Sequence, residues 1–217
     1  MRSLRRIQLT SDDVRIWVAC LADQFGVLEM ELDELDRSVG DGDHGSALKR
    51  GFQAAAEKLA EFKNDELPKA VFMTAGSEFV KGAGGASGLL FSVLFKELGR
   101  ACSESARLQA PAFSKGLTAC VERITKLGKA EIGDKTMLDA LQPASLAAAE
   151  KVSDGLAASI GAAAAAAEIG ALATIEMVAK QGRGRYVAEG GRGHMDPGAK
   201  SVAYIFQSLE EQVVLES

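Results

Sequence analysis

Apolar residues recur every three or four positions along most of this 217-residue chain, which is the spacing that buries one face of a helix. The first such stretch covers residues 10–35, with Asp12 and Asp13 in its opening turn, where acidic side chains favour the helix dipole. Further helices are predicted over residues 44–58, 69–81, 89–98, 112–126, 135–152, 161–179 and 198–214. No stretch is a credible strand, so the periodicity predicts an all-α bundle of eight helices.

Four of the connections between these helices are rich in glycine and polar residues: 36–45, 82–88, 128–136 and 182–198. Counted along the chain, they are the first, third, fifth and seventh connections. In an up-and-down bundle alternate connections share an end. All four are therefore predicted to meet at one end and to form a composite site there.

The first connection concentrates negative charge in the sequence DRSVGDGDHG. Asp36, Asp41 and Asp43 fall within eight positions, with glycines between and beside them. Carboxylates held ~4 Å apart at an effective dielectric of ~20 repel by about 4 kcal/mol, so this loop needs a cation or protons. Oxygen ligands without thiols suit Mg²⁺ or Ca²⁺. The alternative is an exposed acidic turn that caps a helix, and the EF-hand pattern does not fit.

Two further features predict a phosphate site beside these carboxylates. A helix begins at His44, so its first amide groups would favour a phosphate. The turn GAGGASG, residues 82–88, opens another helix in the same way, although a flexible connector is the alternative reading. A metal and a phosphate at one place indicate a nucleotide bound with Mg²⁺.

The other two connections are less specific. Residues 128–136, GKAEIGDKT, differ from a Walker A loop because Asp134 interrupts the motif and no strand precedes it. A capped helix start at 134–136 is the alternative. Residues 181–198 form the longest irregular stretch, and a loop of this length is often a lid or disordered. A short arginine–glycine tract for RNA is a weaker alternative.

Composition narrows the class of protein. The formal net charge is −5, which argues against a nucleic-acid surface. Three scattered cysteines without a C-x-x-C motif fit reduced thiols in a cytoplasm. The first residues lack the apolar run of a signal peptide, and no long uninterrupted apolar stretch predicts a membrane span. The length predicts one domain over residues 1–217.

The acidic segment closely resembles the signature of the dihydroxyacetone kinase L subunit family, the nucleotide-binding part of keto-sugar kinases. The sequence GDKTMLDAL, residues 133–141, matches a second signature of that family. The resemblance implies an eight-helix antiparallel barrel with ADP or ATP at one end. It implies that Asp36, Asp41 and Asp43 bind two Mg²⁺ ions on the phosphates. It also implies nucleotide contacts from His44, Gly45, Ser46, Ala47, Ala86, Ser87, Gly128, Met137, Arg183, Asp196 and Pro197.

The resemblance assigns individual roles as well. Gly128 and Met137 line the base pocket, Arg183 reaches a phosphate, and Asp196 with Pro197 lies near the base or ribose. His44 is the candidate for a catalytic group, with helix capping as its alternative role. Family members often carry Asn or Thr where this chain has Ala47, and this departure could loosen the grip on the nucleotide.

By the same resemblance the keto-sugar is bound by a separate K subunit, so the chain is half of an enzyme. Stand-alone L subunits usually serve the phosphoenolpyruvate-dependent system, in which a phosphocarrier M subunit phosphorylates ADP that stays bound. The alternatives are an ATP-dependent keto-sugar kinase subunit, a non-catalytic nucleotide-binding signalling module and the nucleotide domain of a fatty-acid kinase. A homodimer is left open, and neither a nucleic acid nor a membrane is expected as a partner.

Overall fold

The computed structural model describes residues 8–63 and 66–215. Within these ranges eight α-helices form, no strand is present, and one isolated bridge pairs Leu9 with Leu108. The helices are α1 (Ser11–Arg37), α2 (His44–Leu59), α3 (Pro68–Ala83), α4 (Gly85–Cys102), α5 (Ala110–Gly128), α6 (Leu138–Glu150), α7 (Leu156–Ala173) and α8 (Pro197–Leu215). The predicted all-α fold with eight helices is confirmed.

The helix starts follow from local chemistry. Thr10 caps α1: its hydroxyl accepts a hydrogen bond from the Asp13 amide at 3.3 Å, and the Asp13 carboxylate accepts one from the Thr10 amide at 2.7 Å. This reciprocal pair satisfies two amides that have no partner within the helix. Helix α3 begins with Pro68, whose fixed φ suits a first turn.

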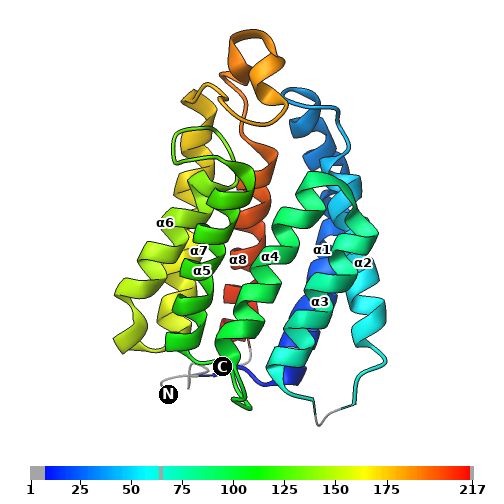
Figure 1. Cartoon of the computed structure of the whole chain (residues 1–217), viewed down its shortest axis with the longest axis vertical. Coiled ribbons are helices and arrows are strands. Elements are labelled where there is room, and N and C mark those ends of the chain that lie inside the picture. The colour runs from blue at the N-terminus through cyan, green and yellow to red at the C-terminus, as the bar shows by residue number, and fades with distance from the viewer. Residues whose placement is uncertain (1–7, 64–65, 216–217) are drawn as a thin grey trace.

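The helices form a closed ring in which each packs against the next along the chain, and α1 also packs against α8. Figure 1 shows them side by side along the long axis of the molecule. The segment between α7 and α8, residues 174–196, covers one end of the ring and is called the lid below. The predicted eight-helix antiparallel barrel is thus the observed arrangement.

The two sides of the ring are packed differently. Between α1 and α4 the core is aromatic: the rings of Phe25 and Phe52 lie 4.6 Å apart, and those of Phe52 and Phe79 lie 4.8 Å apart. On the other side α7 is rich in alanine, and a Cβ on Gly170 would lie 2.1 Å from the Asp139 carbonyl oxygen of α6. Small residues therefore let α6 and α7 approach closely.

Several predicted helix boundaries were wrong. Helix α4 begins at Gly85 and α7 at Leu156, not at residues 89 and 161. Helix α6 begins at Leu138, not at residue 135, because the Asp139 carboxylate accepts hydrogen bonds from the amides of Gly133 and Thr136 and holds 133–136 as a loop. Helix α7 ends at Ala173, not at residue 179, and the chain turns through the 3₁₀ segment Thr174–Glu176 into the lid.

One helix in the described part of the chain is long and apolar enough, by length and composition, to cross a membrane. It covers Leu156–Glu176, with a mean hydropathy of 1.6, and 44% of this window is buried against the rest of the protein. Core helices of soluble proteins meet the same criterion, so length and hydropathy alone do not indicate a membrane span here. The expectation of no membrane span stays a prediction. The expectation about a signal peptide concerns residues 1–13, of which residues 1–7 lie outside the described residues.

Candidate nucleotide and metal site

A cavity of about 440 Å³ lies at the end of the barrel that the lid covers, and lid residues line it. Its lining comes from all four of the connections singled out in the sequence, so the prediction that they meet at one end is confirmed. The volume lies within the ~300–1,000 Å³ typical of small-molecule sites. Twelve of the fourteen residues proposed for the site line it: Asp36, Asp41, Asp43, His44, Ala47, Ala86, Ser87, Gly128, Met137, Arg183, Asp196 and Pro197.

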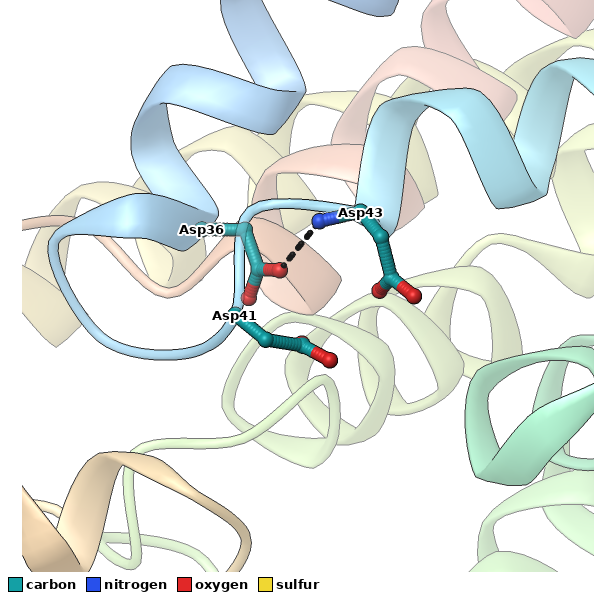
Figure 2. Close-up of side chains that lie close together, drawn as sticks. All are labelled: Asp36, Asp41 and Asp43. Carbon is teal, nitrogen blue, oxygen red and sulfur yellow. Dashed lines mark hydrogen bonds between the residues drawn. The ribbon is translucent and has the colours of Figure 1, made fainter.

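The three aspartates lie on one short arc of chain. Asp36 is in the last turn of α1, Asp41 is in the loop, and Asp43 precedes the first residue of α2 (Figure 2). One oxygen atom from each carboxylate can be chosen so that all three lie within 4.8 Å of one another. Such a cluster of oxygen ligands has the chemistry that a hard divalent cation requires.

The loop that presents them is ordered by Asp36 itself. One Asp36 oxygen accepts hydrogen bonds from the amides of Gly42 at 2.8 Å and Asp43 at 3.0 Å. Gly42 has a φ of +77°, which favours glycine, and a Cβ on Gly40 would lie 2.3 Å from the other Asp36 oxygen. The glycines are therefore needed to fold the loop around this carboxylate.

Positive charge reaches the aspartates from the lid. The guanidinium group of Arg183 contacts the carboxylate of Asp41, and both side chains are substantially exposed. Residues 182–184 of the lid also line the cavity. The lid thus brings a cation to the carboxylate cluster while it covers the opening.

His44 joins α2 to α8 inside the barrel. The residue is only 6% exposed, its Nε2 lies 2.9 Å from the Ser201 hydroxyl, and its ring packs beside Phe91 with centroids 6.0 Å apart. Burial lowers the pKa of His44 to about 4, although Asp36, Asp33 and the Pro197 backbone oppose this. Its burial and its contact with Ser201 of α8 suit a residue that positions α2 against α8.

Gly45 and Ser46 do not line the cavity. A Cβ on Gly45 would lie 2.1 Å from the Glu29 carbonyl oxygen, so this glycine allows α2 to cross α1 closely. The Ser46 amide donates to the Asp33 carboxylate at 3.0 Å, and its hydroxyl donates to the Asp43 carbonyl at 3.0 Å. The two residues fix the start of α2, and the ligand contacts that the resemblance implies for them stay a prediction.

The glycine-rich turn supplies the first turn of α4. Gly84 and Gly85, with φ of +66° and +60°, turn the chain, and Ala86 and Ser87 follow in the helix. The first amides of a helix have no acceptor within it. The residues that carry them here line the cavity together with the aspartates' loop, so they can donate to an anion.

Another part of the lining is apolar. Met137 and Leu138 at the start of α6, Ile124 in α5 and Phe91 in α4 contribute to it beside Gly128. Asp134 is not among the lining residues, because its carboxylate accepts from the Glu131 amide at 2.8 Å and pairs with Lys180 of the lid at 3.3 Å. The cavity therefore combines a carboxylate cluster with an apolar surface that can accept a flat ring.

Asp196 caps α8 at the edge of the lid. Its carboxylate accepts from the Ala199 amide at 2.7 Å, and its own amide donates to the Thr174 hydroxyl at 2.9 Å. Burial raises the pKa of Asp196 to about 7, and the nearby negative charge of Asp139 adds to the shift, while the bond from Ala199 and the charge of Lys135 oppose it. Pro197, the first residue of α8, lines the cavity beside it.

Three residues of the site were missed in the sequence. Lys135 lines the cavity and Asp139 holds the loop around it, and both lie within the GDKTMLDAL segment, which was the available signal. Ser201, the partner of His44, stands 157 positions further along the chain and has no local signature.

Comparison with known proteins agrees with this geometry. Residues 38–211 match the family described as the DAK2 domain. The chain is 33% identical over 209 residues, 95% of its own length and 97% of the other, to the Escherichia coli (strain K12) protein named PEP-dependent dihydroxyacetone kinase, ADP-binding subunit DhaL. It is 34% identical over 182 residues to the L-erythrulose kinase of Pectobacterium atrosepticum, covering 82% of this chain and 31% of that one.

A solved structure shares the fold. The dihydroxyacetone kinase from C. freundii, crystallised in complex with AMP-PNP and Mg²⁺, superposes with a TM-score of 0.69 at 29% sequence identity. The match covers 97% of this chain and 36% of that chain, so the likeness concerns about a third of the kinase. The shared sequence, the shared fold and the matched residues 38–211 together show that the chain belongs to the DAK2 domain family.

Proposed function

We propose that the chain is the nucleotide-binding phosphotransferase subunit of a dihydroxyacetone kinase, formed as one domain over residues 1–217 and working in the cytoplasm. The observation that carries this proposal is the cluster of Asp36, Asp41 and Asp43 beside an apolar-walled cavity under a lid. The E. coli relative, which is similar over nearly its whole length, is named as an ADP-binding subunit of a PEP-dependent dihydroxyacetone kinase.

The three aspartates would hold Mg²⁺. Two ions would be bound between these carboxylates and the phosphates of the nucleotide. Their donor set supports this, because it is made of carboxylate oxygens within 4.8 Å of one another, and Arg183 already places a positive group against Asp41. When bound, the metal supplies charge neutralisation on the phosphate oxygens, which is the main requirement of phosphoryl transfer.

The rest of the lining would position the nucleotide. Gly128 and Met137 lie on the apolar side, where a base can be buried, and Pro197 lies at the lid edge. The amides that begin α4, at Ala86 and Ser87, and the Arg183 guanidinium would bind phosphate oxygens. The lid would exclude water, so that the phosphoryl group reaches its acceptor and is not hydrolysed.

The acceptor is proposed to arrive on a separate K subunit that binds dihydroxyacetone. A phosphocarrier M subunit would rephosphorylate ADP while it remains in the cavity. The K subunit would approach the lid end of the barrel, because the aspartates and the lid residues 182–184 line the same cavity.

A second candidate is a kinase subunit for another keto-sugar that uses exchangeable ATP. The 34% identity to an L-erythrulose kinase supports this second candidate. The two candidates differ in whether ADP is a captive cofactor or a product that leaves.

The nucleotide content of the protein purified with Mg²⁺ tests the proposal. Stoichiometric ADP that survives gel filtration supports the phosphocarrier system, and reversible exchange of ATP and ADP supports the second candidate. Mixing the protein with dihydroxyacetone, K and M subunits, phosphoenolpyruvate and the general phosphocarrier proteins should then yield dihydroxyacetone phosphate.

Binding measurements on matched variants link the result to the site. Asp41→Asn keeps the shape of the side chain but removes a ligand charge, so Mg²⁺-dependent ADP affinity should fall by about thirtyfold or more. Asp23→Asn, on the exposed face of α1, is the control and should bind as the unchanged protein does. If Asp41→Asn bound ADP with Mg²⁺ as tightly as the unchanged protein does, the proposed metal site at the three aspartates would be wrong.

A further inference from the structure

Lys135 is an unusual residue in the loop between α5 and α6. It is only 3% exposed, and its φ of +60° lies in the left-handed region that non-glycine residues rarely adopt. An ammonium group is costly to bury unless it is paired and hydrogen-bonded. Its contacts therefore indicate what this position does.

The Lys135 ammonium bonds to the two ends of the lid at once. Its Nζ lies 2.5 Å from the carbonyl oxygen of Thr174, where α7 gives way to the lid, and 2.5 Å from that of His194, just before α8. These carbonyls are 20 residues apart in the sequence, as the numbers 174 and 194 show. One side chain therefore ties the entry of the lid to its exit.

The loop that carries Lys135 is itself held firmly. The Asp139 carboxylate accepts from the amides of Gly133 at 2.6 Å and Thr136 at 2.7 Å, on both sides of Lys135. The lid is joined to the same loop by its backbone, because the Lys180 amide donates to the Asp134 carbonyl at 3.1 Å. The ammonium is thus presented from a fixed base.

The chemistry of the contact suits lysine in particular. An ammonium has three donors and no acceptor, so it can serve two carbonyl oxygens at the same time. Burial lowers the pKa of Lys135, while the negative charges of Asp196, Asp139 and Glu176 oppose that shift. Methionine would fill similar space but would leave both carbonyl groups without this donor.

We propose that Lys135 is a positioning residue that holds both ends of the lid against the barrel and so sets how fast a bound nucleotide leaves. Lid residues 182–184 line the cavity, and Arg183 contacts Asp41, so a lid released at its ends would uncover the site. The nature of the departing ligand rests on the proposed function, whereas the closure of the lid does not.

Hydrogen exchange in the ligand-free protein tests the closure directly. In Lys135→Met, amides of residues 177–193 should exchange about tenfold faster or more, because two charge-assisted hydrogen bonds are lost. Peptides from α2, α3 and α4 should be unchanged. The control is Lys180→Met, which removes an equal charge from the lid but only an ion pair whose lysine is exposed, while the Asp134 carboxylate keeps its bond from the Glu131 amide. This variant should stay within about twofold of the unchanged protein.

The release rate of ADP, measured after dilution into excess unlabelled nucleotide, gives the functional readout. Lys135→Met should accelerate release by a similar factor, and Lys180→Met should not. Equal acceleration in both variants would show a general effect of lost positive charge and would overturn the proposal.

The outcomes separate the two proposals. If nucleotide does not bind but lid exchange still rises in Lys135→Met alone, the proposed function fails and the closure by Lys135 stands. If hydrogen exchange of the lid amides is unchanged in Lys135→Met, the proposal that Lys135 holds the lid closed is overturned, whether or not nucleotide binds. If Lys135→Met loses helix content, Lys135→Gln is measured in the same way and decides the question.

Discussion

The guanidinium group of Arg183, on the lid, contacts the carboxylate of Asp41, in the loop between α1 and α2. The two residues are 142 positions apart in the sequence, from 41 to 183. Their contact joins the cover of the cavity to the carboxylate cluster that would hold metal. The positive charge of Arg183 therefore partly neutralises the carboxylate cluster. When a nucleotide binds, the metal would neutralise the carboxylates, and Arg183 would pair with a phosphate.

This contact predicts the effect of Arg183→Gln. The variant loses a charge-assisted donor to phosphate, worth ~1.5–3 kcal/mol for a well-formed bond, and screening at this exposed position reduces the effect. The affinity for ADP with Mg²⁺ should fall about tenfold in a calorimetric titration. Arg185→Gln is the matched control, because that guanidinium stacks on the exposed ring of Tyr186, 4.6 Å from its centroid. Equal losses in both variants would contradict a specific role for Arg183.

Asp196 predicts a dependence of stability on pH. Its pKa in the folded protein is about 7, above the ordinary 3.8, so between these values the folded state binds a proton that the unfolded state has released. The stabilising contribution is therefore complete below about pH 4 and is lost as pH rises to about 7.

Asp196→Asn removes this titration while an amide oxygen can still accept from Ala199. The variant should be more stable than the unchanged protein by about 2 kcal/mol at pH 8, roughly half of the full linkage because the residue is partly exposed. The difference should vanish near pH 4. Urea unfolding of the ligand-free proteins across this range measures it, and parallel stability curves would refute the assignment.

Replacing Gly170 by alanine should lower the stability of the protein, although helix propensity alone predicts that it would raise it. Alanine in a helix interior is usually favoured over glycine by about 1 kcal/mol. At Gly170, however, the new Cβ would lie 2.1 Å from the Asp139 carbonyl oxygen, so α6 and α7 would have to separate. Gly170→Ala should lower the free energy of unfolding by about 2 kcal/mol.

Gly26→Ala, in α1, is the contrasting substitution, because its Cβ would meet nothing within 4 Å. It should raise the free energy of unfolding by about 1 kcal/mol. Chemical denaturation of both variants measures the difference in sign. A gain in both would show that α6 and α7 can shift apart without loss.

The cysteines predict a simple labelling pattern. Cys20 is exposed, whereas Cys102 and Cys120 are buried. Burial raises the pKa of Cys102 to about 11 and also raises that of Cys120, so their reactive thiolate forms are suppressed. A disulfide reagent at pH 8 should label one thiol rapidly in the folded protein and all three after denaturation. Cys20→Ser should abolish the rapid phase.

The sequence by itself determined the all-α class, the eight helices and the end of the bundle at which the site lies, whereas the barrel was implied by the family resemblance. Helical periodicity and the parity of the polar connections depend on local spacing, which each segment carries by itself, and both agree with the barrel and its cavity. The aspartate cluster was also predictable, because Asp36, Asp41 and Asp43 are close in the chain and repulsion limits how such a loop can fold.

Tertiary structure decided what depends on contacts between distant segments. The start of α6 at Leu138 is the exception, because its cause is local: the Asp139 carboxylate accepts hydrogen bonds from the amides of residues 133 and 136. Gly45 and Ser46 lie outside the cavity lining because they contact Glu29 and Asp33, where α1 crosses α2. Lys135 gained its place beneath the lid because Thr174 and His194 meet there. No local pattern encodes such pairings, since their partners are brought together only when the barrel closes.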